Sequence, residues 1–206
     1  MRWRVHLLLV PFALLACVAA FAPLNAIDTV ISRTAQRQTW ADTLARAVSW
    51  VGYKPTSIYA VLVVVVAVFA IGWRRDAVFL GISTGGGWLL YKAIQLLVAR
   101  PRPTLPIHGA GGFTGPSFPS GHVMNYMALF GFMITVLLRR LQPSPARTAA
   151  IVGLAVLIVL VGPARVYLGA HFASDVLGGY ALGGWWVLVI ATFYSPRATQ
   201  PSASAS

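Results

Sequence analysis

Long apolar segments dominate the chain and are separated by short polar ones. A helix that crosses the roughly 30 Å hydrocarbon core of a bilayer needs about 20 predominantly apolar residues. Six segments approach that length, and they are Val5–Leu24, Thr56–Trp73, Ala77–Val98, His122–Leu138, Thr148–Gly162 and Ser174–Tyr194. Backbone groups in lipid must hydrogen-bond within their own segment, so these segments are expected to be helical. The pattern predicts an all-α fold, a bundle of six transmembrane helices.

Arginines are distributed unevenly over the segments between these spans. If there are six spans, eight arginines fall on one side of the membrane, namely Arg2, Arg4, Arg74, Arg75, Arg139, Arg140, Arg147 and Arg197. The positive-inside rule assigns that side to the cytoplasm. Both termini are then inside, and residues 25–55, 99–121 and 163–173 face outward.

The outward segment 25–55 carries apolar residues at spacings that suit a helix with one apolar face. We predict an amphipathic helix on the membrane surface there, between the first and second spans; a solvated linker is the alternative. The first span is long enough to be a retained helix rather than a cleaved signal. Residues 1–196 are expected to form a single integral-membrane domain, followed by a disordered cytoplasmic tail over 197–206.

The composition supports a membrane protein and disfavours several classes of chemistry. Hydrophobic residues make up 58% of the chain and charged residues 10%, whereas soluble domains carry about 25% charged residues. The chain has no Glu, and its four acids, Asp28, Asp42, Asp76 and Asp175, are widely separated. Paired-carboxylate glycoside hydrolysis and carboxylate-rich metal sites are therefore disfavoured. Cys17 is the single cysteine, which excludes an intrachain disulfide.

The formal net charge of +12 favours anionic partners. In a membrane chain, much of such charge anchors loops to lipid headgroups. The expected partner is therefore the lipid bilayer and not nucleic acid, and neither a metal nor a cofactor is expected.

Charged and polar residues collect at the outward ends of three predicted spans. The three groups are Lys92 with Arg100 and Arg102; Ser120 with Gly121 and His122; and Arg165 with His171 and Asp175. Charges within or at the edge of a membrane are costly and mark functional sites. Three unrelated membrane anchors would not be expected to share one face, so we predict that the groups form one site.

The first two groups suit an anion. Arg100 and Arg102 alternate with prolines that end the third span, and a guanidinium matches phosphate oxygens in pairs; lipid headgroups are the alternative target. Ser120 is a candidate N-cap of the fourth span, and Gly121 lets an anion approach the helix N-terminus closely. His122 can exchange a proton near neutral pH.

The third group suits nucleophilic chemistry. His171 and Asp175 are four residues apart, so the carboxylate can accept a hydrogen bond from one ring nitrogen of His171. That contact fixes the tautomer and leaves a lone pair on the other nitrogen, which makes His171 a candidate nucleophile or base. Asp175 as a simple helix N-terminal acid is the alternative. Arg165 supplies a further anion contact.

These residues resemble the signature of the type 2 phosphatidic acid phosphatase and vanadium haloperoxidase superfamily, in its membrane lipid phosphatase branch. Its second part, Pro-Ser-Gly-His, is intact at 119–122, and its third part, Arg-x5-His-x3-Asp, is intact in spacing at Arg165, His171 and Asp175. The resemblance covers roughly Lys92 to Gly184, the expected catalytic core at 92–184.

The first part of the signature departs from the family pattern. The family has a Lys seven residues before its Arg, and counting back from Arg102 gives Gln95. Lys92 lies almost one helical turn earlier, on nearly the same face. Either Lys92 reaches the phosphate with its long side chain, or Gln95 donates a neutral hydrogen bond in its place.

The resemblance implies a metal-independent phosphatase that forms a phosphohistidine. It implies that His171 attacks phosphorus, that Asp175 orients His171, and that His122 protonates the leaving oxygen and then activates water. The phosphate would be held by a set of basic and backbone donors, namely Arg102, Arg165, Ser120 and Gly121, with further substrate contacts from Arg100, Lys92 and Gln95.

The resemblance also implies a lipid substrate. The predicted topology puts the site at the outer edge of the bilayer, which in a bacterial plasma membrane faces the periplasm or exterior. Candidates are phosphatidate, phosphatidylglycerol phosphate, polyprenyl diphosphate and lipid A phosphates, and a polyprenyl diphosphate or a phosphatidate-type lipid is favoured. Three alternatives stay open at this point. They are a lipid phosphotransferase with the same site, a non-catalytic lipid transporter or scaffold, and a vanadate-dependent haloperoxidase.

Overall fold

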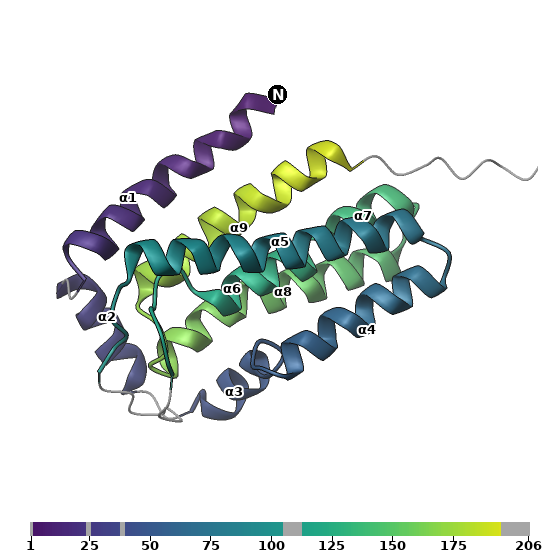
Figure 1. Cartoon of the computed structure of the whole chain (residues 1–206). Helices are drawn as coiled ribbons and strands as arrows, with labels where there is room; N and C mark the ends of the chain where they lie inside the picture. The colour runs from purple at the N-terminus through teal and green to yellow at the C-terminus, as the bar shows by residue number, and fades with distance from the viewer. Residues whose placement is uncertain (1, 24–25, 38–39, 105–112, 195–206) are drawn as a thin grey trace, which may run out of the picture.

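The computed structural model describes residues 2–23, 26–37, 40–104 and 113–194, and these contain helices and no strand. The elements in chain order are η1 (Arg2–Leu8, a 3-10 helix), α1 (Leu9–Phe21), α2 (Ala26–Gln36), α3 (Asp42–Trp50), α4 (Thr56–Ala70), α5 (Arg74–Val98), α6 (Gly121–Tyr126), η2 (Met127–Gly131, a π-helical turn), α7 (Phe132–Arg140), α8 (Pro145–Tyr167) and α9 (Ala173–Phe193). Figure 1 shows their arrangement. The all-α prediction is confirmed. The predicted tail at 197–206 lies outside the described residues.

Four continuous helical segments are long and apolar enough to cross a bilayer: α5, Gly121–Arg140, α8 and α9. A fifth span is possible if Val5–Phe21 and α2 are taken together, and α4 is a shorter apolar helix of 15 residues. The structure therefore supports an integral membrane protein with four to five spans by length and composition. Six spans with both termini inside stay a prediction.

The fifth predicted span is longer than the apolar pattern indicated. The apolar run Thr148–Gly162 is short for a span unless Pro163 to Tyr167 extend it, and α8 does continue through Pro163 to Tyr167. Its start is set by Ser144, whose Oγ accepts a hydrogen bond from the backbone N–H of Arg147 at 3.2 Å. The extension places Arg165 inside the last turn of α8.

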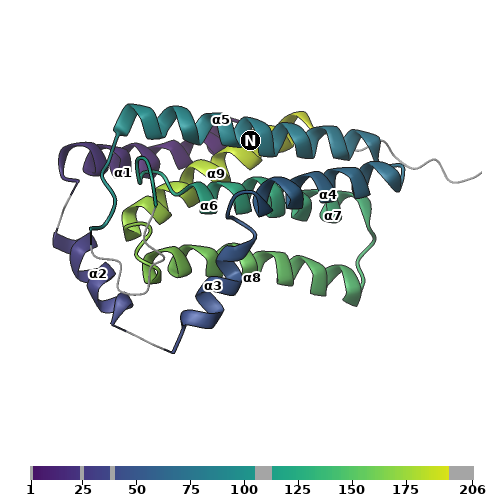
Figure 2. The same ribbon diagram turned by 60° about the horizontal axis from the view of Figure 1, so that its bottom comes forward.

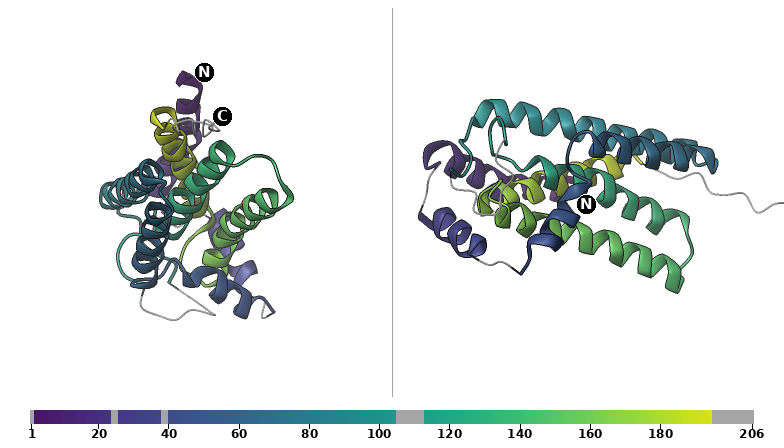
Figure 3. Two further views of the ribbon diagram at one scale, coloured as in Figure 1. Left: turned by 90° about the vertical axis from the view of Figure 1, so that its right-hand side faces the viewer. Right: turned by 90° about the horizontal axis from the view of Figure 1, so that it is seen from below.

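The segment from α6 through α7 is the centre of the bundle, because it packs against α5, α8 and α9. Figures 2 and 3 show these helices running along a common direction, with α1 beside α9. The α4–α5 and α7–α8 turns lie at one end of the bundle, next to the Arg74–Arg75 and Arg139–Arg140 pairs. Helices α2 and α3 lie toward the opposite end, together with the C-terminal ends of α5 and α8 and the N-terminal ends of α6 and α9.

Segment 25–55 forms two helices, so the prediction of one surface helix was wrong. In α2 the buried residues are polar: Asp28, Ser32 and Gln36 follow one another at intervals of four and face the bundle. The apolar residues Ile27 and Val30 are 74% and 62% exposed on the other side of the helix. The apolar face of α2 therefore points away from the protein, as expected of a helix whose partner on that side is lipid.

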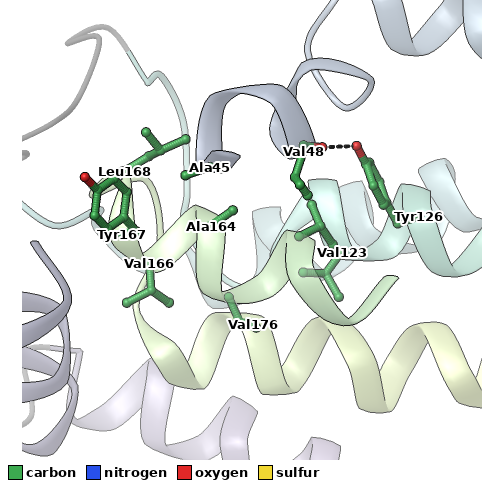
Figure 4. Packing of buried hydrophobic residues seen from close by; sticks show 10 residues of the cluster. Ala45, Val48, Val123, Tyr126, Ala164, Val166, Tyr167, Leu168 and Val176 are labelled. Carbon is green, nitrogen blue, oxygen red and sulfur yellow. Dashed lines mark hydrogen bonds between the residues drawn. The ribbon is translucent and has the colours of Figure 1, made fainter. Parts of the chain in front are cut away.

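Helix α3 packs its apolar residues onto α8. Ala45 and Val48 belong to a buried cluster with Val123, Ala164 and residues that follow in α8 and α9 (Figure 4). At the same place the phenolic O–H of Tyr126 donates to the backbone carbonyl of Val48. These contacts hold α3 against α6 and α8.

Glycines permit close packing at some helix contacts and leave space at others. A Cβ built on Gly179 would lie 3.0 Å from Val123, and one on Gly86 would lie 2.5 Å from Trp186. A Cβ on Gly81 or Gly85 would meet no atom within 4 Å. The glycines of α9 thus bring α6 close, whereas Gly81 and Gly85 border the open groove described below.

Candidate active site

The three groups of polar residues predicted from the sequence meet around one cavity. Its volume is about 370 Å³, and its wall includes Lys92, Gln95, Arg102, Gly121, His122, Arg165 and His171. These residues come from the end of α5, the segment that follows it, the start of α6, the last turn of α8 and the α8–α9 connection. Residues distant in sequence are brought together because α5 and α8 end, and α6 and α9 begin, at the same end of the bundle.

His171 lies in the tight turn between α8 and α9. The backbone N–H groups of Ala170 and His171 both donate to the carbonyl of Arg165, at 3.0 and 3.3 Å, and Gly169 takes φ = +71°, a left-handed conformation that suits glycine. The ring is almost fully buried at 2% exposure, yet it borders the cavity. The turn therefore fixes the imidazole next to the end of α8.

The contacts of His171 define its tautomer. Its Nε2 lies 3.3 Å from Nη1 of Arg102. A guanidinium has donors and no acceptor, so this contact requires a lone pair on Nε2. The proton of the neutral ring is then on Nδ1, which lies 3.6 Å from Oδ2 of Asp175, just beyond hydrogen-bonding distance.

Asp175 is held by the backbone at the start of α9. Its Oδ2 accepts from the N–H of Phe172 at 2.9 Å, and its Oδ1 accepts from Nη1 of Arg100 at 2.7 Å. Its backbone carbonyl accepts from the N–H of Ser120 at 3.0 Å, which ties α9 to the start of α6. The two interpretations of Asp175 are compatible, since it bonds a free N–H group at the helix start and also faces His171.

Burial controls the charge of the site. It lowers the pKa of His171 from 6.5 to about 4, an effect that Asp175 opposes and the positive charge of Arg102 reinforces. Burial and then the charge of Arg165 also lower the pKa of Arg102, but a guanidinium stays protonated at neutral pH. Near neutral pH, a neutral imidazole thus faces a cationic pocket.

Arg165 and His122 are both positioned by Tyr53, which lies between α3 and α4. Nη1 of Arg165 donates to the hydroxyl of Tyr53 at 2.7 Å. The Tyr53 ring packs edge-on against the His122 ring, with centroids 4.9 Å apart. Nε2 of His122 is buried and has no hydrogen-bond partner among the residues described. That nitrogen is therefore available for a proton transfer at the cavity.

Lys92 and Gln95 both reach the cavity, and they do so as a pair. Nζ of Lys92 donates to Oε1 of Gln95 at 3.2 Å. Nε2 of Gln95 donates to the carbonyls of Pro116 and Pro119, at 3.1 and 3.4 Å. The Gln95 amide is therefore occupied by the loop before α6, and Lys92 is the member of the pair with donors left for a ligand.

Arg100 and Ser120, both predicted to contact substrate, are not among the residues that line this cavity. The guanidinium of Arg100 is buried and paired with Asp28 and Asp175, each at 2.7 Å. Ser120 stands at the N-cap position of α6, but its side chain makes no capping bond, and its buried Oγ has no partner in the described part of the chain. Arg100 thus acts behind the site and not within it.

Several residues of the site carried no signal in the sequence. The cavity wall also includes Tyr53, Lys54, Trp88, Tyr91 and Asn125. Tyr53 and Lys54 belong to the outward segment 25–55, in which they look like ordinary loop residues. Asp28 could have been suspected, because it is one of only four acids in the whole chain.

A second, mostly apolar groove of about 480 Å³ continues from the cavity between α4 and α5. The two share a boundary formed by Lys54, Ser57, Thr84, Trp88 and Asn125. Beyond it the groove is lined by Ile58, Val61, Leu62 and Val65 of α4 and by Gly81 and Gly85 of α5. The polar cavity and the apolar groove are thus continuous.

Within the described residues no cluster of three or more His, Cys, Asp and Glu side chains could hold a metal ion. The donors that surround the cavity are instead guanidinium, ammonium, imidazole and backbone groups. Such a set of donors suits an oxyanion such as phosphate.

Comparison with known proteins shows the family of the chain. The family model described as the PAP2 superfamily matches residues 76–198.

The chain belongs to the PAP2 superfamily.

Among relatives in this superfamily, phosphatidylglycerophosphatase B of Bacillus subtilis is 31% identical over 178 residues, which cover 84% of this chain and 85% of that protein. Lipid A 1-phosphatase of Rhizobium etli is 29% identical over 135 residues, which cover 61% of this chain and 52% of that protein. A crystal structure described as the first transmembrane PAP2 type phosphatidylglycerolphosphate phosphatase from Bacillus subtilis matches with a TM-score of 0.82 at 27% identity, covering 93% of this chain and 96% of that one. The prediction of a phosphatase of the PAP2 superfamily is confirmed.

Proposed function

We propose that the protein is a metal-independent membrane phosphatase that hydrolyses a lipid phosphate or lipid diphosphate through a phosphohistidine. The observation that carries this proposal is the 3.3 Å contact between Nε2 of His171 and Nη1 of Arg102 on the wall of a cationic cavity. A nucleophile and an anion-binding group at one point are what phosphoryl transfer to a side chain requires.

In the first step, a phosphate group binds between the cationic side chains Lys92, Arg102 and Arg165. A phosphate oxygen then accepts the Nη1–H hydrogen bond of Arg102 that is directed at Nε2 of His171 in the free protein. The lone pair of Nε2 is thereby free to attack. Nε2 then forms a bond to phosphorus while the bond from phosphorus to the lipid oxygen breaks. His122 gives its proton to that oxygen, so the lipid leaves as an alcohol, or as a lipid monophosphate if the substrate is a diphosphate.

In the second step, water attacks the phosphohistidine. His122, now neutral, accepts a proton from the water as its oxygen bonds to phosphorus. The N–P bond breaks, its electron pair returns to Nε2 of His171, and inorganic phosphate leaves. Asp175 faces Nδ1 throughout, so it stabilises the positive charge that the ring carries while phosphorylated.

The groove supports a lipid as the substrate. A phosphate in the polar cavity would have its tail next to the apolar wall formed by α4 and α5. The relatives are named for phosphatidylglycerol phosphate and lipid A. Among the candidate lipids, a phosphate monoester on a glycerolipid and a polyprenyl diphosphate both place a tetrahedral phosphate at the end of an apolar chain.

The proposed orientation places the cavity at the outer face of the membrane. Two arginine pairs, at 74–75 and 139–140, lie at the end of the bundle opposite the cavity. The positive-inside rule assigns that end to the cytoplasm. Substrate headgroups would then enter from the periplasm or exterior.

The test is phosphate release by purified protein from a panel of lipids in detergent. The panel contains phosphatidate, phosphatidylglycerol phosphate, a polyprenyl diphosphate and lipid A 1-phosphate, with His171→Asn as the inactive control. We expect release from at least one lipid, competitive inhibition by vanadate and no effect of EDTA. Transfer of the phosphoryl group to a second lipid would identify a phosphotransferase instead, and no turnover of any lipid would contradict the proposal.

A further inference from the structure

Asp28 of α2 is buried behind the site although it lies outside residues 76–198, which the superfamily model matches. Its Oδ2 lies 2.7 Å from Nη2 of Arg100. Its Oδ1 accepts from the backbone N–H of Ser174 at 2.9 Å, and its Oδ2 also accepts from the Ser174 hydroxyl. Asp28 therefore connects α2 to the first turn of α9, the turn that carries Asp175.

Arg100 lies between Asp28 and Asp175. Its Nη1 donates to Oδ1 of Asp175 at 2.7 Å and to Oγ of Ser174 at 2.6 Å, while Nη2 donates to Asp28. The guanidinium also lies 4.3 Å above the centre of the Phe172 ring. The side chains form a buried row, Asp28–Arg100–Asp175, that ends at His171.

The order of charges in this row explains how the Asp175 carboxylate can contact Arg100 with one oxygen and face His171 with the other. Asp28 occupies one side of the Arg100 guanidinium, so Asp175 offers Arg100 only Oδ1 and keeps Oδ2 toward Phe172 and His171. A guanidinium whose second carboxylate is removed favours a bidentate pair with the one that remains. Such a pair would draw Oδ2 of Asp175 away from Nδ1 of His171.

We propose that Asp28 is a positioning residue for catalysis: through Arg100 it keeps one oxygen of Asp175 directed at His171. The proposal rests on the proposed function, in which His171 is the nucleophile. Asp28 is not among the residues that line the cavity in which the phosphate would bind. Its loss should therefore lower the rate of phosphoryl transfer and leave substrate binding nearly unchanged.

The test compares Asp28→Asn with Asp76→Asn. Asp76 is an equally buried acid, paired with Arg140 at 2.6 Å at the other end of the bundle. For Asp28→Asn we expect kcat to fall by roughly 10- to 100-fold, in the range seen when residues that orient a site are lost, with KM within about threefold of wild type. For Asp76→Asn we expect kcat within about threefold. Equal losses of kcat in the two variants would show a general effect of losing a buried acid and would overturn the proposal.

A second readout needs no substrate. The ¹⁵N shifts of the His171 ring report which nitrogen carries the proton and what that nitrogen faces. Asp28→Asn should move the Nδ1 signal of His171, and Asp76→Asn should not. If wild type hydrolyses no lipid but this signal moves, the proposed function fails while the positioning role stands; an unmoved signal contradicts the role itself.

Two further variants keep the proposal testable if Asp28→Asn does not fold. Ser174→Ala removes one link between Asp28 and α9 without changing charge, and it should lower kcat by about two- to fivefold and move the same signal, in keeping with the loss of one neutral hydrogen bond. Arg100→Gln should lower kcat as well, and adding Asp28→Asn to it should cause little further loss, because Asp28 acts through Arg100. Unchanged kcat and signal in Ser174→Ala, or independent losses in the double variant, would contradict the proposal.

Discussion

Nη1 of Arg102 lies 3.3 Å from Nε2 of His171, so the group that would hold the phosphate and the atom that would attack it meet at one point. Arg102 is itself held by carbonyls, since Nε donates to Gly115 at 3.0 Å and Nη1 to Ala170 at 2.7 Å. The guanidinium is therefore fixed before a phosphate arrives. Fixed donors stabilise developing charge without a cost of reorganisation.

The burial of His171 predicts its ionisation state. Because burial lowers its pKa to about 4, the imidazole should be neutral from pH 5 upward. A titration of ¹⁵N-labelled protein, with His171→Asn to assign the signal, should place the pKa of His171 near 4. A pKa of 6.5 or higher in the folded protein would contradict the burial of a neutral ring.

The same pKa shift predicts how stability depends on pH. Between pH 6.5 and about 4 the unfolded chain binds a proton at position 171 that the folded protein does not bind. The contribution of His171 to the free energy of unfolding is therefore complete above pH 6.5 and is lost as the pH falls toward 4. Thermal unfolding in detergent should show a smaller decrease in stability over this range for His171→Asn than for wild type.

Lys92 should supply the positive charge that the family lysine supplies elsewhere. Lys92→Met removes one charge-assisted contact worth about 1.5–3 kcal/mol, so kcat/KM should fall by about one to two decades. Gln95→Met should also lower kcat/KM, since Lys92 then loses its acceptor and two loop carbonyls lose their donor. Arg46→Met is the control, because Arg46 forms an exposed ion pair with Asp42 within α3. Activity of Lys92→Met within threefold of wild type would remove Lys92 from the phosphate site.

The groove between α4 and α5 should hold the lipid tail. Gly85→Leu adds a side chain where a Cβ meets no atom within 4 Å, so it should fill the groove without disturbing the helices. We expect kcat/KM for a long-chain lipid phosphate to fall by about tenfold or more, as expected from the loss of several buried methylene contacts, with little change for p-nitrophenyl phosphate. Gly153→Leu on α8 is the matched control, because Gly153 has equally open surroundings outside the groove. Equal effects on both substrates would show that the groove does not bind the tail.

The sequence predicted the helices and the grouping of polar residues at one cavity better than it predicted the contacts behind that cavity. Apolar length sufficed for α5 and α9, and the spacing of His171 and Asp175 sufficed to place these two side chains near each other. Both are local features, determined within one helix or one turn.

The features that were missed depend on contacts between distant segments. Arg100 was predicted to contact the substrate because its neighbours in sequence suit phosphate. In the structure its guanidinium is instead paired with Asp28, which lies 72 residues earlier in the chain. Segment 25–55 was predicted to form one amphipathic helix on the membrane surface, and nothing in its periodicity shows that α2 turns a polar face to the bundle. Tyr53 reaches Arg165 only because α3 packs on α8.

The most direct test of the account is detection of the phosphoryl group on His171. Purified protein is mixed with ³²P-labelled lipid phosphate, quenched in alkali within the first turnover and digested for mass spectrometry. We expect an alkali-stable, acid-labile phosphate on the peptide that contains His171, and neither label nor turnover in His171→Asn. Label on another residue, or turnover of His171→Asn within tenfold of wild type, would contradict it.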